Sequence, residues 1–391
     1  MKRKLYLLVS GLIVLSVVLA ACTTATPTST GGGETVQVTV EVPVTVEVPV
    51  TVEVPVEGTP STTEVQVPVT FAEAGNTLQA VLDRGRLVCG GNAVVRGFGY
   101  LDPDTQQYAG FDIDYCKAIA AAIFDDPEAL EIVPTTGQNR FPTLQSGEID
   151  ILIRNTTWTM SRDTSLGFDF GPTTFYDGQG MMVRKDSGIE SLEDLEGGTV
   201  CVQQGTTTEL NLATVMAFLG VTYEPIVLAD ATATREAYDQ GRCDGFTTDK
   251  SGLVSQQLDL AVPDDHIILD VTMSKEPLGP LVRHGDNNWS DIMDWVVYCT
   301  IAGEEHGITS ENVDDMLGSD DPVIQRTLGV AGDLGLALGL TADFCARVIR
   351  HVGNYGEIYD RHLGPDTPFN LPRGLNALYT DGGLQYSMPF N

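Results

Sequence analysis

From Thr77 to the C-terminus, stretches that favour helices alternate with short apolar stretches that favour strands, and this alternation constrains the fold most. The predicted strands span residues 86–89, 149–153, 199–203 and 244–247. The predicted helices span residues 78–84, 111–124, 207–218, 233–240, 291–305 and 342–351, with one more ending at 143–147 and a short one starting at Ser191. Such alternation predicts an α/β fold whose sheets are mostly parallel and bind ligands beyond the carboxyl ends of their strands.

This region is about 315 residues long, more than one small hydrophobic core supports. The alternation starts again near Leu192, so two lobes are expected, each a mostly parallel sheet flanked by helices. Lobe 1 is assigned to residues 77–178 and 279–391, and lobe 2 to residues 179–278. The chain would cross between the lobes near Asp177 and Lys275, and these crossings would form a hinge beside a ligand cleft.

The N-terminus has the layout of a secretory signal, with three basic residues at 2–4 followed by an uncharged apolar run over 5–21. The run ends in LAAC at 19–22, which resembles the bacterial lipobox, so residues 1–21 are assigned to a lipoprotein signal peptide and Cys22 to lipid attachment. The alternative is an ordinary signal peptide followed by an incidental cysteine. Lipid on Cys22 would hold the protein on the outer face of the cell membrane, on the periplasmic side or the cell surface.

Residues 22–76 are rich in Thr, Ser, Gly, Val and Pro, and the hexapeptide TVEVPV occurs three times over 39–56. A proline in every sixth position removes a donor from any β-ladder, which favours an extended, semi-rigid linker. The alternative is that the repeats pair into a small sheet or associate with those of another copy. No segment after Cys22 has the roughly 18 apolar residues of a membrane helix.

The charge of the chain argues against one class of partner. Removal of residues 1–21 takes away three basic residues and no acidic one, which leaves 19 basic residues against 54 acidic ones, a formal charge of −35. A surface this acidic repels phosphate backbones, so nucleic acid is not expected as a partner. The acidic residues are scattered along the chain, which is typical of a solvated surface rather than of a binding site.

Six cysteines remain after Cys22 and are even in number, which favours disulfides in an exported chain. They are Cys89, Cys116, Cys201, Cys243, Cys299 and Cys345. Six cysteines allow 15 pairings; pairing in chain order is preferred because each bond then joins elements expected to pack within one lobe. The chain has no C-x-x-C and its five histidines stand far apart, so neither metal nor any other cofactor is expected.

Three polar segments follow predicted strands, at 154–163, 203–209 and 247–249. Arg162 in the first could bind a carboxylate through two charge-assisted hydrogen bonds, or instead form a surface salt bridge with Asp163 or Asp169. The second segment is a glycine turn whose following amides can accept an anion, but its threonines and glutamate equally suit a helix N-cap. Asp249 in the third could bind an ammonium group or cap the next helix.

Together these segments offer an arginine and backbone amides for a carboxylate and an aspartate for an amine, the two halves of a zwitterion. Burial of either ligand charge without a partner would be costly, so a site for amino acids must supply both. The three segments therefore predict a site for an amino acid at the cleft.

Several motifs resemble the extracellular solute-binding proteins of polar-amino-acid ABC importers, and within them the general L-amino-acid-binding branch. The first set consists of GFDID at 110–114, FPTLQSGEID at 141–150, NTTWTMSR at 155–162, QGTT at 204–207 and GRCD at 241–244. The second consists of VCVQ at 200–203, NTTWT at 155–159, KEPLGP at 275–280, VGNYGE at 352–357 and LPRGLN at 371–376. The resemblance runs from about Thr77 to the C-terminus and implies the two-lobed type II periplasmic-binding-protein fold.

The resemblance also implies roles for individual residues. Arg162 would hold the ligand carboxylate with help from the backbone near Thr207, and Asp249 would bind the α-ammonium group. Asn155 and Thr157 would add polar contacts from the first lobe. Where many relatives have an aromatic residue that stacks on the ligand, this chain has GQN at 137–139, which suits broad specificity.

The expected function is capture of L-amino acids and their delivery to the permease subunits of an ABC importer, without chemistry on the ligand and as a monomer. The alternatives are an amino-acid sensor domain, or a dehydratase or lyase built on the same fold. A lyase would need a general acid or base facing the ligand. Apart from Asp163, which could pair with Arg162, the polar segments contain only the carboxylates of Glu209 and Asp249.

Overall fold

The computed structural model describes residues 36–40, 48–52 and 75–391, and the chain divides into two units at residues 69 and 70. In the first unit, β1 (Val36–Val40) pairs antiparallel with β2 (Val48–Val52), with Val36 opposite Val52. These strands overlap the hexapeptide repeats, so that part of the linker forms the small sheet that was the alternative to an extended chain. The predicted signal peptide and Cys22 lie outside the described residues.

The second unit contains a five-stranded sheet, a six-stranded sheet in which five strands form one continuous order, and a small three-stranded sheet. The first sheet has the order β7 (Leu130–Pro134), β3 (Leu87–Gly91), β8 (Ile151–Leu152), β16 (Leu281–Arg283), β9 (Phe168–Phe170). The second has the order β12 (Glu224–Leu228), β11 (Thr199–Gln203), β13 (Gly245–Asp249), β10 (Phe175–Arg184), β14 (His266–Ile268). In each of the two larger sheets one strand, β16 or β10, is antiparallel to all of its neighbours and the other strands share a direction, as the alternation of helix and strand predicts.

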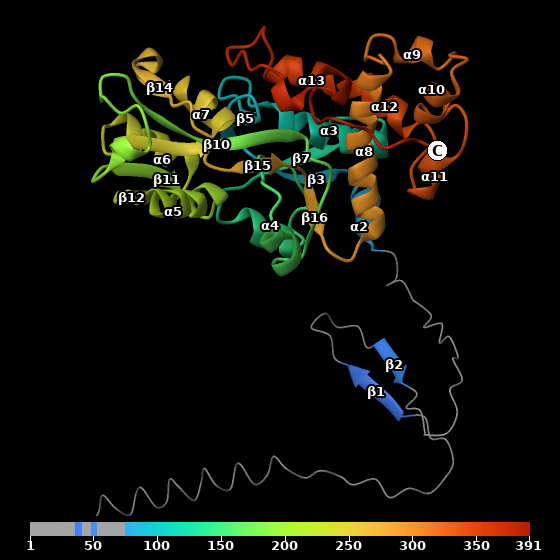
Figure 1. The fold of residues 1–391 in the computed structure, drawn as a ribbon. Coiled ribbons are helices and arrows are strands. Elements are labelled where there is room, and N and C mark those ends of the chain that lie inside the picture. Colours follow the sequence, from blue (N-terminus) through green and yellow to red (C-terminus); the bar gives the residue numbers. More distant parts are fainter. Residues whose placement is uncertain (1–35, 41–47, 53–74) are drawn as a thin grey trace, which may run out of the picture. The chain divides into compact units, whose positions relative to one another are not determined.

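Strand β10 connects the two sheets, as Figure 1 shows. Its first half pairs antiparallel with β15 (Lys275–Leu278), so that Phe175 lies opposite Leu278 and Gly178 opposite Lys275, and its second half joins the second sheet. The two segments predicted to cross between lobes therefore lie side by side.

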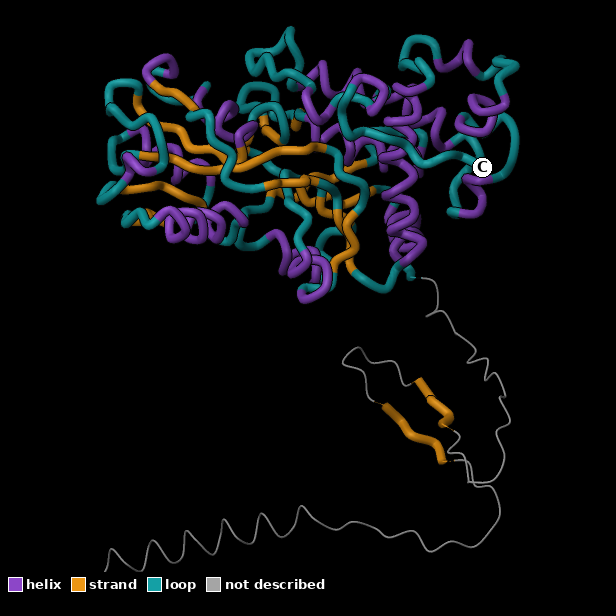
Figure 2. Tube along the Cα trace, viewed as in Figure 1, coloured by secondary structure: helices purple, strands orange, loops and turns teal. Residues whose placement is uncertain are grey.

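Helices cover both faces of the second sheet. Apolar residues of α5 (Thr207–Leu219) pack on one side with Met181 and Val200, while α6 (Ala231–Asp239) and α7 (Lys250–Gln257) pack on the other with Met182 and Phe246. On the first sheet, α3 (Phe111–Phe124), α8 (Asn287–Glu305) and α12 (Phe344–Val352) share one large core. Figure 2 shows these helices and strands by class.

The remaining helices and strands of the second unit are short. They are α2 (Thr77–Arg84), β4 (Val94–Val95), β5 (Gly99–Leu101), β6 (Tyr108–Ala109), α4 (Arg140–Gln145), α9 (Val313–Met316), α10 (Pro322–Thr327), α11 (Leu334–Ala337) and α13 (Tyr355–His362). The predicted strand at 149–153 is limited to two residues, and the short helix expected from Ser191 is a 3-10 turn at Glu193–Leu195. Among the described helices, none combines the length and the apolar character that crossing a membrane requires.

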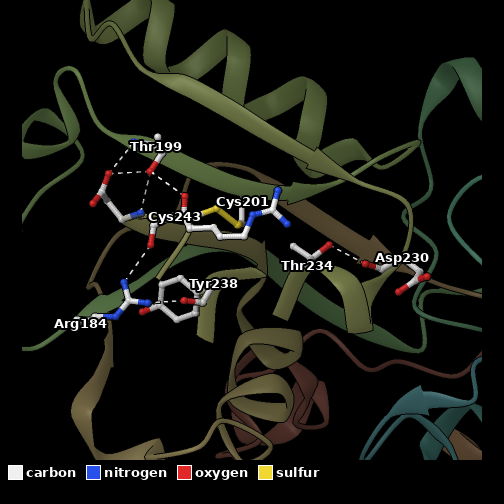
Figure 3. Close-up of a disulfide and its surroundings, with 9 residues drawn as sticks. Arg184, Thr199, Cys201, Asp230, Thr234, Tyr238 and Cys243 are labelled. Atoms are coloured by element: carbon white, nitrogen blue, oxygen red, sulfur yellow. Dashed lines mark hydrogen bonds between the residues drawn. A yellow bond between two sulfur atoms is a disulfide. The ribbon is translucent and has the colours of Figure 1, made fainter. Parts of the chain in front are cut away.

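The structure contains three disulfides, paired in chain order. Cys89–Cys116 joins β3 to α3, and Cys299–Cys345 joins α8 to α12, with Cα atoms 6.1 Å and 5.4 Å apart. The third, Cys201–Cys243, starts from β11 (Figure 3). Cys243 precedes β13 by two residues, and its carbonyl accepts a hydrogen bond from Arg184 at 3.0 Å.

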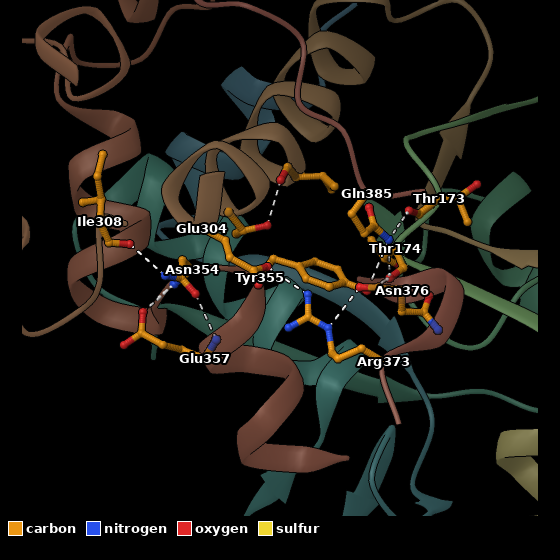
Figure 4. A network of polar contacts seen from close by, with 12 residues as sticks. Thr173, Thr174, Glu304, Ile308, Asn354, Tyr355, Glu357, Arg373, Asn376 and Gln385 are labelled. Carbon is orange, nitrogen blue, oxygen red and sulfur yellow. Dashed lines mark hydrogen bonds and ion pairs between the residues drawn. The ribbon is translucent and has the colours of Figure 1, made fainter. Parts of the chain in front are cut away.

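The C-terminal segment contacts the first residues of the connecting strand β10 (Figure 4). The side-chain amide of Asn376 accepts from the backbone N–H of Tyr176 at 2.6 Å and donates to its carbonyl at 3.2 Å. The hydroxyl of Tyr355 donates to the carbonyl of Thr174 at 2.8 Å. Arg373 donates to Glu304 at 2.9 Å and lies over the ring of Tyr355, which fixes this segment against the core.

Candidate functional site

The five predicted site residues lie at or after the ends of strands of both sheets. Asn155 and Thr157 follow β8 of the first sheet, while Thr207 begins α5 and Asp249 ends β13 of the second. The hydroxyls of Thr157 and Thr207 lie 3.3 Å apart, and the amide of Asn155 donates to Asp249 over 3.3 Å. Four of the five residues therefore meet directly across the space between the sheets.

Arg162, the fifth, lies in a π-helical turn at Ser161–Ser165 and is buried. Its guanidinium donates to the carbonyl of Thr157 at 2.7 Å, which directs it toward the same space. The alternative surface salt bridges do not form, because Asp163 accepts from Trp158 and Asp169 faces His284. Burial lowers the pKa of Arg162 to about 10, against the opposing effect of the carboxylates of Glu276 and Asp249.

The turn before α5 forms the helix cap that was considered for it. The hydroxyl of Thr206 accepts from the backbone N–H of Glu209 at 3.1 Å, and Glu209 in turn accepts from the N–H of Gly205 at 2.9 Å, so the helix is capped. Thr207 takes no part in the cap, and its hydroxyl is directed at Glu276.

Asp249 does not cap α7, although it stands at the N-cap position, because its side chain accepts no hydrogen bond from the first turn of that helix. It is buried and, among the described residues, forms no ion pair with a basic side chain. Burial, with the nearby carboxylates of Asp177 and Glu276, raises the pKa of Asp249 well above its ordinary value. A carboxylate in this setting gains most from the arrival of a cation.

Glu276 is a site residue that the residue patterns alone did not identify. It lies in β15 with only 1% of its surface exposed, and its carboxylate accepts from Thr207 at 2.9 Å, from Asn211 at 2.8 Å, and from the hydroxyls of Thr157 and Ser274. It therefore links both sheets with the connecting segment. The signal in the sequence was its place beside the predicted crossing at Lys275.

Two further buried arginines accompany Arg162 on the side of the first sheet. Arg154 donates to the carbonyl of Thr135 at 2.9 Å, and Arg140 donates to the hydroxyl of Thr156 at 3.2 Å. On the opposite side, burial raises the pKa of Asp177 to about 6, and Ser251 donates to its carboxylate. The first sheet thus presents cations and the second sheet and connecting strands present carboxylates, which matches a zwitterionic ligand.

Two sheets joined by a pair of adjacent crossing strands, with polar side chains of both meeting between them, define the two-lobed type II periplasmic-binding-protein fold, as expected from the motifs. Residues 87–305 match the model of the bacterial extracellular solute-binding proteins, family 3, and the chain belongs to this family. The resemblance found in the motifs is confirmed.

Similar proteins cover most of the chain. The general L-amino acid-binding periplasmic protein AapJ of Rhizobium johnstonii is 51% identical over 81% of this chain and 94% of its own length. The glutamate/glutamine/aspartate/asparagine-binding protein BztA of Rhodobacter capsulatus is 48% identical over 82% of this chain and 95% of its own. A solved periplasmic binding protein of an ABC transporter from Brucella ovis, with glutathione bound, has a TM-score of 0.79 and 47% identity, covering 81% of this chain and all of that one. The relatives are substrate-binding transport proteins.

Proposed function

We propose that this protein captures L-amino acids between its two lobes and delivers them to the permease of an ABC importer, without chemistry on the ligand. The observation that carries the proposal is the separation of charge across the site. Buried arginines stand on the side of the first sheet, and the buried carboxylates of Asp249 and Glu276 stand on the other. An α-amino acid carries one charge of each sign at a fixed spacing and satisfies both sides at once.

Each predicted residue has a place in this scheme. Arg162 receives the α-carboxylate through charge-assisted hydrogen bonds, and Asp249 receives the α-ammonium group. The hydroxyls of Thr157 and Thr207 and the amide of Asn155 supply neutral donors and acceptors that orient the ligand, because they already meet where the sheets face each other.

The proposal includes a movement in which the two lobes close around the ligand. Lobe 1 comprises residues 77–178 and 279–391, lobe 2 comprises residues 179–278, and the paired segments β10 and β15 form the hinge. Outside the amino-acid site, Arg96 forms an ion pair with Asp259 at 2.8 Å, joining a loop of lobe 1 to the turn after α7 in lobe 2. A ligand gripped by both lobes favours the closed form, which is the form delivered to the permease.

Broad specificity toward side chains is part of the proposal. Gly137 and Gly205 bring the backbones of the two lobes so close that a Cβ on Gly137 would lie 2.8 Å from the carbonyl oxygen of Gln204. With glycine in this stretch, no aromatic ring stacks on the ligand from there. The similarity to AapJ, a general L-amino acid-binding periplasmic protein, also supports broad specificity.

Anchoring completes the proposal. Lipid on Cys22, after removal of residues 1–21, would hold the protein on the outer face of the membrane as a monomer near its permease, with residues 22–76 as linker. The basic and apolar pattern at 2–21 and the LAAC motif support this assignment.

Isothermal titration calorimetry with the common L-amino acids tests the central claim. We expect saturable binding of several of them at one site, with product analysis showing each ligand recovered unchanged. Absence of binding to every L-amino acid would refute capture, and conversion of a bound amino acid would favour the dehydratase or lyase alternative.

A further inference from the structure

The first turn of α7 is not capped by the residue that stands before it. The first N–H groups of a helix have no partner within the helix, and the side chain at the N-cap position usually accepts from one of them. Aspartate is among the best residues for this purpose. Asp249 stands at the N-cap position of α7, yet its carboxylate accepts from Asn155 at 3.3 Å and not from the helix. Its place in the sequence thus favours a cap that the structure does not contain.

The cap is supplied instead by Asp177, on the strand β10 that runs between the two sheets. One oxygen of its carboxylate accepts from the backbone N–H of Ser251 at 3.3 Å and also from the Ser251 hydroxyl. Ser251 is the second residue of α7, and its N–H is one of the two that an N-cap side chain normally binds. The other oxygen accepts from the N–H of Gly178 at 2.8 Å, which orients the carboxyl group. Asp177 therefore occupies a donor that Asp249 would otherwise bind.

Asp177 and Asp249 are neighbours in the second sheet. In the ladder between β10 and β13, Asp249 lies opposite Gln179, which comes two residues after Asp177. Side chains two residues apart on a strand point to the same face, so the two carboxyl groups are diagonal neighbours there. After burial, the negative charge of Asp177 is the next cause that raises the pKa of Asp249. Both carboxyl groups thus stand beside the same helix terminus.

The place of Asp177 is otherwise unfavourable for a carboxylate. It lies opposite Glu276 in the ladder between β10 and β15, and like charges directly opposite each other destabilise a strand pair. No basic side chain among the described residues forms an ion pair with it. Burial raises its pKa to about 6, against the hydrogen bonds from Ser251 and Gly178, which favour the charged form. Of these hydrogen bonds, those from Ser251 link Asp177 to the helix that follows Asp249.

We propose that Asp177 is a positioning residue for amino-acid capture: it caps α7 from the strand between the lobes and so keeps the carboxylate of Asp249 free for the ammonium group of the ligand. This inference rests on the proposed function and adds to it a residue that acts through Asp249. Without Asp177 the first turn of α7 lacks an acceptor, and Asp249 turns toward it because it already stands at the N-cap position. The ligand then has to withdraw Asp249 from the helix before it can bind.

The competition for Asp249 determines the size of the effect. An N-cap aspartate typically shifts the equilibrium of its helix by about fivefold, and by about 30-fold in the strongest cases. Asp177→Ala should therefore lower the affinity for every L-amino acid by about fivefold to 30-fold, whatever its side chain. Asp177→Asn should bind within about threefold of wild type, because asparagine caps helices as well as aspartate does and keeps an oxygen for Ser251.

Titration calorimetry at pH 7.5 on the whole mature protein tests this, with each L-amino acid that binds the wild type. Besides the two single variants, Asp177→Ala is combined with Asp249→Ala. In that background it should change affinity less than about twofold, because its effect passes through Asp249. Asp321→Ala is the matched control, since Asp321 caps α10, outside the site, by accepting from the N–H of Val323 at 2.7 Å. It should lower the melting temperature and leave affinity unchanged.

Three results would overturn the role of Asp177 while leaving capture of L-amino acids intact. Unchanged affinity in Asp177→Ala would show that Asp249 needs no help. Equal losses in Asp177→Ala and Asp177→Asn would show that Asp177 contributes only its charge. A full loss that persists when Asp249 is alanine would show that Asp177 acts independently of it. Should Asp177→Ala not fold, Asp177→Ser replaces it with the same expectation, because its hydroxyl is one bond too short to bind Ser251 in the same way. If the wild type binds no L-amino acid, the proposed function itself fails.

Discussion

Replacement of Asp249 by Asn tests the electrostatic basis of the site with opposite effects on binding and on stability. The substitution keeps the shape and the contact with Asn155, which lies 3.3 Å from the carboxylate, but removes the charge assigned to the ligand ammonium group. Loss of one partner of a buried, hydrogen-bonded charge pair costs about 2–5 kcal/mol, so affinity for L-amino acids should fall about 30-fold to several thousand-fold.

The same substitution should increase the unfolding free energy of the ligand-free protein. The folded pKa of Asp249 is raised above its ordinary value of 3.8, chiefly by burial and then by the charge of Asp177. The stability that its bound proton contributes is therefore fully present below pH 3.8 and lost as pH rises through the raised folded value. Asp249→Asn should accordingly be more stable than wild type in urea unfolding at pH 7, with the difference shrinking toward pH 4.

The raised pKa of Asp249 also predicts that protons are released when the ligand binds. Arrival of an ammonium group lowers the pKa of Asp249, so the wild-type protein should release protons on binding, and calorimetry in two buffers of different ionisation enthalpy counts them. Asp249→Asn should release fewer. Asp294 provides a matched control, because burial raises its pKa to about 7 but it lies on α8, outside the site. Asp294→Asn should change stability without changing affinity or proton release. Equal affinity and equal proton release in Asp249→Asn and wild type would refute the reasoning.

Three further predictions follow from other parts of the structure. Arg162→Ala should weaken binding of every L-amino acid by about 2–5 kcal/mol in calorimetry, and wild-type affinity would remove Arg162 from the site. Asn376→Ala should lower the unfolding free energy by about 2–4 kcal/mol in urea, because both backbone groups of Tyr176 lose their partner; an unchanged value would show that they find another. Cys22→Ala should abolish incorporation of labelled fatty acid and release the protein from membranes, whereas persistent labelling would place the lipid elsewhere.

Much of the fold follows from patterns within single segments. The helices at 111–124 and 207–218 and the strand at 199–203 were predicted within a residue or two, because a strong boundary such as Gly110, Gly205 or Gly220 lies beside each. The strand at 149–153 was predicted too long, because the carboxylate of Asp150 accepts from the backbone N–H of Val88 and the ladder begins only at Ile151. Local pattern does not determine where tertiary contacts end a strand.

The site was predictable only where strand ends carry polar residues. Asn155, Thr157 and Asp249 stand just after or at the end of buried strands, and topology brings such positions together. Glu276 escaped because it lies within β15 rather than after a strand, and Arg140 escaped because β7, the strand that precedes it, was not predicted. Each looks like an ordinary surface charge until the packing of both lobes shows it to be buried.

The direct contacts across the site explain why ligand and closure belong together. The hydroxyls of Thr157 and Thr207 and the pair Asn155 and Asp249 meet at 3.3 Å, which is long for a hydrogen bond, and such contacts contribute about 1 kcal/mol each or less. The ion pair of Arg96 with Asp259 is partly exposed and adds at most about 1 kcal/mol. Against these gains, closure without ligand buries arginines and carboxylates that do not pair with each other. An amino acid removes that cost, so capture and closure are one event.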